Sequence, residues 1–129
     1  MPIIFFEPGE NLQGIDSSLA EQIDIMPTIL NYLGYPKPYF AFGQDLFNPK
    51  HEKFTVSYLG HFYQLLQNNW LLLFNENETK GLFNLSTDIY ADINLIGKAD
   101  SIQHRLELNA HAFLQQYIAH ITENKMLVE

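Results

Sequence analysis

The hydrophobic pattern of this chain changes period along its length, and that change is the strongest constraint on its fold. From Glu52 onward, apolar and polar side chains alternate in four short runs, "KFTVSYL", "HFYQLLQ", "NNWLLLFNE" and "KGLFNLS". Alternation is the period of a β-strand with one buried face. The separators at 59–60, 67–69 and 75–79 contain the glycine and asparagine that tight turns favour. The sequence therefore predicts a four-stranded antiparallel meander.

Helical periodicity appears on both sides of this region. Ile25, Ile29 and Leu33 recur at i, i+4 and i+8. Asp24 can cap the start of such a helix, and Gly34 can end it in the left-handed conformation. At the C-terminal end a longer helix is predicted, with an apolar face of Ile102, Leu106, Ala110, Phe113, Leu114, Tyr117 and Ile121. We expect this face to cover one side of the meander, giving two layers.

The N-terminal run Ile3–Phe6 is apolar on both faces and is closed by Pro8 and Gly9. Such a run predicts a buried strand of a sheet that is covered on both sides. The expected fold class is therefore α+β: a buried strand, a short helix, a four-stranded antiparallel meander and a C-terminal helix. A chain whose first residues are already core-like is expected to be a fragment of something longer.

Charge and composition exclude several classes of function. The 129 residues include 15 acidic and 7 basic side chains, for a formal net charge of −8. No Lys/Arg cluster is present, which excludes nucleic-acid binding and direct contact with anionic lipid. The absence of cysteine excludes disulfides, thiolate zinc ligands and a cysteine nucleophile. The longest apolar run, "WLLLF", is too short to span a bilayer, and the N-terminus lacks the features of a signal peptide.

Five histidines are the first candidates for chemistry. His104 and His111 lie two helical turns apart, so their Cβ atoms stand ~10 Å apart, too far to share a metal ion ~2.1 Å from each ligand. His51 lies in a charged loop, and His120 lies at the edge of the apolar stripe. His61 follows a glycine at a hairpin, where a loop could aim it into a cleft. It has no partner in the sequence to orient it as a base or ligand.

The remaining polar residues form no complete catalytic set. The chain has no HExxH, P-loop, GxSxG, GxGxxG or EF-hand pattern. Thr28 has no base or oxyanion nest nearby and is expected on the helix surface. The aspartates fall at caps or turns, where they bind local N–H groups: Asp24, Asp45, Asp88 and Asp92. We therefore assign no catalytic, cofactor-binding or metal-ligating residue, and His61 is the sole candidate.

Four segments in this order resemble the last third of sulfatase-type enzymes of the alkaline-phosphatase superfamily: "MPIIFFEPG", "AEQIDIMPTILNYLGY", "YFAFGQDLF" and "GLFNLSTDIYADINLIG". The closest resemblance is to the membrane-anchored lipoteichoic-acid synthase or phosphoglycerol-transferase group. Those proteins have an "xPxxxYxPG" strand, a "QxDxxPTxLxxLG" helix and an "FGxDLF" loop. The last segment is similar to the sulfatase pattern "LYDLxxDPxExxNL", with Ile89 where the family usually has proline.

The resemblance implies an alkaline-phosphatase-like α/β parent. Residues 1–50 would form the last strand, helix and loop of its sheet domain, and residues 51–129 a small antiparallel-sheet-plus-helix subdomain beside the active-site cleft. In that superfamily a threonine, serine or formylglycine nucleophile and divalent-metal ligands carry out the chemistry. They belong to segments upstream of those matched here, so none can be carried over, and Thr28 corresponds to a scaffold threonine.

The resemblance thus implies that this chain is the non-catalytic C-terminal portion of a larger metal-dependent enzyme. That enzyme would be either a phosphoglycerol or phosphoethanolamine transferase, or a sulfate-ester hydrolase. The portion would be inactive alone and would hold no cofactor itself. Its expected partner is the remainder of the parent catalytic domain, at the periplasmic or extracellular face of the cytoplasmic membrane. Self-association of the isolated chain is also expected, because the Ile3–Phe6 strand would lack the neighbouring strands of the parent sheet. The alternative is a free-standing interaction module that binds a partner through sheet edges.

Overall fold

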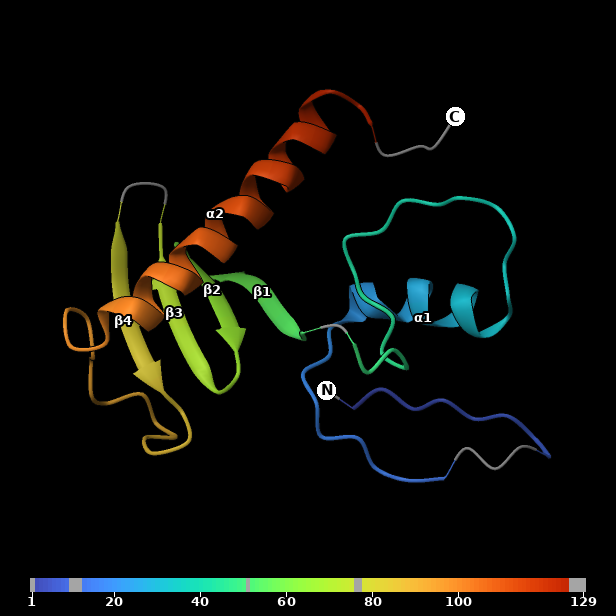
Figure 1. Cartoon of the computed structure of the whole chain (residues 1–129), viewed down its shortest axis with the longest axis horizontal. Coiled ribbons are helices and arrows are strands. Elements are labelled where there is room, and N and C mark those ends of the chain that lie inside the picture. Colours follow the sequence, from blue (N-terminus) through green and yellow to red (C-terminus); the bar gives the residue numbers. More distant parts are fainter. Residues whose placement is uncertain (1, 10–12, 51, 76–77, 126–129) are drawn as a thin grey trace.

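The structure is a computed structural model that describes residues 2–9, 13–50, 52–75 and 78–125. The chain forms an α+β fold in which a four-stranded antiparallel sheet is combined with two helices (Figure 1). The elements in chain order are η1 (Gln22–Asp24), α1 (Ile25–Tyr32), β1 (Phe54–Leu59), β2 (Phe62–Gln67), β3 (Trp70–Phe74), β4 (Thr79–Asn84) and α2 (Asp100–Thr122). The predicted meander and both predicted helices are confirmed.

The sheet is a simple meander because its first two connections are tight turns. The strand order is β1-β2-β3-β4, and each strand is antiparallel to the next. Gly60 and His61 have φ angles of 60° and 73°, and Asn68 and Asn69 have φ angles of 49° and 63°. Two successive residues with positive φ match the right-handed twist of the flanking strands, which explains why glycine and asparagine occupy these turns.

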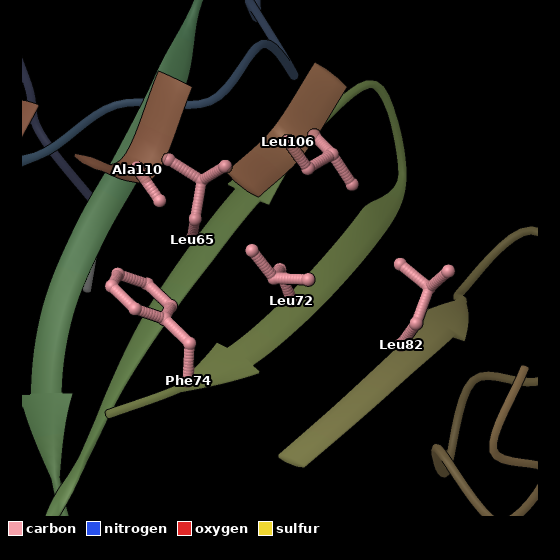
Figure 2. Close-up of a cluster of buried hydrophobic side chains, with 6 residues drawn as sticks. All are labelled: Leu65, Leu72, Phe74, Leu82, Leu106 and Ala110. Carbon is pink, nitrogen blue, oxygen red and sulfur yellow. The ribbon is translucent and has the colours of Figure 1, made fainter. Parts of the chain in front are cut away.

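The core lies between one face of the sheet and the first half of α2. Leu65, Leu72 and Leu82 stand side by side on three neighbouring strands and are fully buried. Figure 2 shows these leucines pointing toward Leu106 and Ala110 of α2. The predicted two-layer packing is therefore confirmed.

The second half of α2 extends beyond the strands (Figure 1). Tyr117 and Ile121, which the sequence places on the buried face, are 42% and 49% exposed. An aromatic cluster supports this half of the helix instead. In that cluster Phe42 packs against Tyr117 with ring centroids 5.2 Å apart, and Phe40 stacks on His120 at 4.3 Å.

The predicted buried strand at Ile3–Phe6 is wrong. The segment has no regular secondary structure, and Ile4 and Phe6 are each 84% exposed. Phe5 faces inward, with its ring 5.2 Å from that of Phe47. The physical reason is that the four described strands pair only with one another, so no sheet is available to bury both faces of this segment.

Helix α1 ends as its sequence predicts. Gly34 has a φ of 63°, the left-handed conformation that glycine adopts without steric cost. The N–H of Tyr35 donates to the carbonyl of Leu30 at 2.9 Å, and the N–H of Gly34 donates to the carbonyl of Asn31 at 3.1 Å. This pair of hydrogen bonds is a Schellman motif, which satisfies the last carbonyls of the helix.

Candidate functional site

Asp24 and Thr28 tie the start of helix α1 to the loop that follows it. The carboxylate of Asp24 accepts hydrogen bonds from the backbone N–H groups of Glu21 and Gln44, both at 2.7 Å. The hydroxyl of Thr28 donates to the Asp24 carbonyl at 2.6 Å and accepts from the N–H of Leu46 at 2.9 Å. Both side chains are buried, with exposed fractions of 6% and 0%. They therefore fix the loop at two points through specific polar contacts.

Two expectations about these residues are corrected. Asp24 does not cap α1 through N–H groups that follow it, because the 3-10 turn η1 precedes the helix and the carboxylate reaches back to Glu21 and across to Gln44. Thr28 is not on the helix surface but in the contact with the loop. The missed signal was their i, i+4 spacing, which places both side chains on one helix face.

Gly43 allows the loop to approach η1, directly before α1, this closely. A Cβ atom at this position would lie 2.0 Å from the carbonyl oxygen of Ile23, far inside contact distance. Glycine is the one residue that fits such an approach between two backbones. The "FGQDLF" loop is therefore shaped by its contact with the helix.

Glu21 lines an open hollow of about 370 Å³ between the start of α1 and strand β1. Three separate segments form the hollow: the N-terminal run, the turn before α1 and the outer strand of the sheet. The other lining residues are Ile3, Ala20, Gln22, Ile23 and Val56. Glu21 is thus the single ionisable side chain in a lining that is partly apolar and partly polar.

Partial burial raises the pKa of Glu21 to about 7. A hydrogen bond from the backbone of Val56 lowers the pKa, and the negative charge of Asp24 raises it further. Burial outweighs the hydrogen bond because the carboxylate loses part of its water without gaining a cation. A carboxyl group that titrates near neutral pH in a hollow is the strongest candidate for function in the described part of the chain.

The raised pKa of Glu21 predicts a pH-dependent stability. The folded-state pKa of about 7 lies above the ordinary value of 4.5, so the folded chain holds a proton that the unfolded chain has released between these pH values. Stability from this group is therefore fully present below pH 4.5 and is lost as the pH rises toward 7. After allowance for its partial exposure, we expect a loss of about 1–2 kcal/mol. Urea unfolding of wild type and Glu21→Gln at pH 5 and pH 8 measures it.

The variant isolates this effect because glutamine keeps an acceptor for Val56 and cannot ionise. Glu21→Gln should be more stable than wild type at pH 8 and should lose this part of the pH dependence. Asp92→Asn removes one charge at an exposed position and should leave the wild-type pH dependence intact. An equal slope in Glu21→Gln and wild type would contradict the assignment.

A second hollow, of about 180 Å³, lies where the β3–β4 hairpin meets α2. The Oε1 atom of Glu107 accepts hydrogen bonds there from the hydroxyl of Thr79 at 2.5 Å and from Nε2 of Gln103 at 2.9 Å. The lining residues are Leu72, Phe74, Asn75, Glu78, Thr79, Glu107 and His111. The hollow thus combines an apolar floor with a polar rim.

The chemistry of this second hollow favours a structural role. The hydrogen bond from Thr79 holds the pKa of Glu107 below its ordinary value, and Gln103, His104 and His111 lower it further. A carboxylate with a lowered pKa is a poor general base, so it does not activate the Thr79 hydroxyl as a nucleophile. The Thr79–Glu107 hydrogen bond instead fastens α2 to β4.

The structure does not bring the histidines together. His61 occupies the β1–β2 turn with a φ of 73° and is exposed. His104 and His111 are exposed, and Nδ1 of His120 lies 2.8 Å from the carbonyl of Gln116. His51 lies outside the described residues. Within residues 2–9, 13–50, 52–75 and 78–125, no three His, Cys, Asp or Glu side chains could hold a metal ion together.

Comparisons with known proteins add no assignment. In the described part of the chain, neither helix has the length and hydrophobicity needed to cross a membrane. The chain matches no protein-family model, and no curated protein matches it.

Proposed function

We propose that this chain is the C-terminal, non-catalytic portion of a sulfatase-like, metal-dependent phosphoglycerol or phosphoethanolamine transferase or sulfate-ester hydrolase. In this proposal residues 1–50 complete the sheet domain of the alkaline-phosphatase-like parent. Residues 51–129 form a subdomain beside its cleft. The nucleophile and the divalent-metal ligands belong to upstream segments of the parent.

The observation that carries the proposal is the contact between the two most specific segments of the resemblance. Asp24 and Thr28 are the D and T of "QIDIMPTILNYLG", and both bind backbone N–H groups of "FGQDLF". Gly43 supplies the close approach. The residue types shared with the family are thus those that join helix to loop here, which is the role expected of a scaffold.

Exposed apolar side chains near α1 and the N-terminal segment support the proposal that a neighbouring domain covers this part of the chain. Met26 and Ile29 of α1 and its C-cap residue Leu33 follow one another at helical spacing and are 48%, 41% and 71% exposed. Ile4 and Phe6 are exposed as well. An amphipathic helix ordinarily buries such a stripe, because exposed apolar area costs ~25 cal/mol per Å² relative to burial. We propose that the remainder of the parent catalytic domain covers this surface, and that the isolated chain self-associates through it.

The parent is proposed to act at the periplasmic or extracellular face of the cytoplasmic membrane, by analogy with the resembled group. The present chain would contribute no membrane contact and no nucleic-acid contact. Its net charge of −8 and lack of a basic cluster agree with this division of roles.

The alternative is a free-standing module that binds a partner through a sheet edge. The exposed end of β1 favours it, since Tyr58 and Leu59 are 62% and 67% exposed. The edge of β4 does not, because the N–H of Leu95 donates to the Leu82 carbonyl at 2.8 Å and Oδ1 of Asn94 accepts from the Leu82 N–H at 3.1 Å. One edge is therefore already occupied by the chain itself.

The proposal predicts that the chain alone has no turnover. Purified chain would be assayed with bis(p-nitrophenyl) phosphate and p-nitrophenyl sulfate, with Mn²⁺, Mg²⁺, Ca²⁺ or Zn²⁺ added in turn. An active enzyme of each class serves as the positive control for the substrates. Metal-dependent turnover that is lost in His61→Ala would overturn the proposal and place chemistry in this chain.

A further inference from the structure

The hollow around Glu21 combines apolar side chains with one partly buried carboxyl group. Ile3, Ile23 and Val56 come from three different segments and supply apolar side chains to its wall. Ile23 is itself 45% exposed, so part of the apolar lining is open to solvent.

No basic side chain of the described residues offsets the charge of Glu21. The charged group that acts on it is Asp24, another carboxylate, whose two oxygens already accept from Glu21 and Gln44. Lys53, the residue before β1, interacts with other groups. Its Nζ donates to Ser18 Oγ at 2.8 Å and to the Leu46 carbonyl at 2.9 Å, and lies 3.5 Å from Asp16.

We propose that this hollow docks a polypeptide segment of a partner protein, which places a Lys or Arg side chain against Glu21 and apolar side chains against Ile3, Ile23 and Val56. The inference does not depend on the proposed function, because it rests on the lining of the hollow alone. The cation supplies the positive charge that no described basic side chain of this protein places beside Glu21. The flanking apolar residues cover the surface that surrounds it.

A polypeptide fits this surface better than a metal ion does. Hard cations require about six oxygen ligands, whereas a single carboxyl group is available here. The hollow is open and bounded by the edge strand, and Ile23 in its lining is 45% exposed, so its occupant must cover apolar surface as well as meet the carboxyl group. An extended segment with alternating basic and apolar residues has this shape and this charge.

Proton linkage gives the proposal a specific signature. A cation binds the ionised form of Glu21, so binding below pH 7 must first release the proton that burial retains. Affinity should therefore rise about tenfold between pH 6 and pH 8, in proportion to the ionised fraction. Ordinary surface carboxylates are fully ionised over this range, so attraction to them changes little.

The test is an NMR titration of the ¹⁵N-labelled chain with acetyl-Ala-Leu-Arg-Leu-Ala-amide at pH 6 and pH 8. We expect shifts of the Ile23 and Val56 amides and about tenfold tighter binding at pH 8. A peptide with citrulline in place of arginine has the same shape without the charge and should bind at least about tenfold more weakly, as expected for loss of a partly desolvated ion pair.

Chain variants separate Glu21 from the other acidic groups and from the histidines. Glu21→Gln should lose both the affinity and its pH dependence, whereas the charge-matched Asp92→Asn should bind as wild type does. Both variants keep all five histidines, so a histidine effect would persist in both. The proposal is overturned if the peptide does not bind, if the citrulline peptide binds equally, or if Glu21→Gln keeps the pH dependence.

Discussion

Asp24→Ala is expected to release the loop from α1 and to destabilise the chain by about 3 kcal/mol. The substitution removes both acceptors of the buried carboxylate and leaves the N–H groups of Glu21 and Gln44 without them. Each hydrogen bond to a charged acceptor contributes roughly 1.5–3 kcal/mol, and an unsatisfied donor carries its own desolvation cost. The loss would be a large fraction of the stability of a domain of this size.

Hydrogen exchange locates this effect, which global unfolding alone would not. The Gln44 amide should exchange much faster in Asp24→Ala, whereas the amides of β2 and β3 should change little. Asp92→Ala, at an exposed position, should change stability by less than about 0.5 kcal/mol. Unchanged protection of Gln44 in Asp24→Ala would show that the carboxylate does not hold the loop.

Leu72→Ala is expected to destabilise the sheet and α2 together by about 3–5 kcal/mol. Leu72 is fully buried between Leu65 and Leu82, and α2 packs over it (Figure 2). The substitution removes apolar contacts and leaves a cavity that three neighbouring elements cannot close without losing their register. Urea denaturation followed by far-UV circular dichroism measures the loss.

The matched control is Leu59→Ala, because Leu59 lies in the same sheet but is 67% exposed. It should cost less than about 1 kcal/mol, since little buried area is removed. Similar losses for Leu59→Ala and Leu72→Ala would contradict the assignment of the core to the face covered by α2.

The sheet and helices could be predicted because their signals are local. Alternation around Gly60 and Asn68-Asn69 defines each hairpin within a few residues, and the turns require the positive φ that glycine and asparagine tolerate. Gly34 likewise ends α1 by a local rule. The strand prediction for Ile3–Phe6 is wrong because a strand needs a neighbouring strand to pair with. No local sequence pattern indicates whether such a strand is present.

The candidate site could not be predicted because its contacts are long-range. Glu21 and Val56 are 35 positions apart, and the burial that raises the pKa of Glu21 depends on how three segments meet. Thr28 contacts Leu46 for the same kind of reason. The hairpin position of His61 makes it a candidate for function in the sequence. In the structure this residue has the positive φ of an ordinary turn residue.

The sequence resemblance and the structure bear on different parts of the proposal. The resemblance supplies the identity of the parent, which remains a proposal. The structure shows that hydrogen bonds join "QIDIMPT" to "FGQDLF". It also shows that the apolar stripe along α1, which a covering domain would bury, is exposed. Both agree with the scaffold role proposed for this chain.

The proposed scaffold role is tested most directly by sequencing the DNA immediately upstream of the codon for Met1 in the source genome. We expect an open reading frame that continues into this chain and encodes an Asp-His pair shortly before the segment at Pro2–Phe6. Further upstream it should encode either an unmodified threonine nucleophile, which indicates a transferase, or a Cys/Ser-x-Pro-x-Arg motif, which indicates a sulfatase. An upstream sequence with none of these would contradict the account and favour the free-standing interaction module.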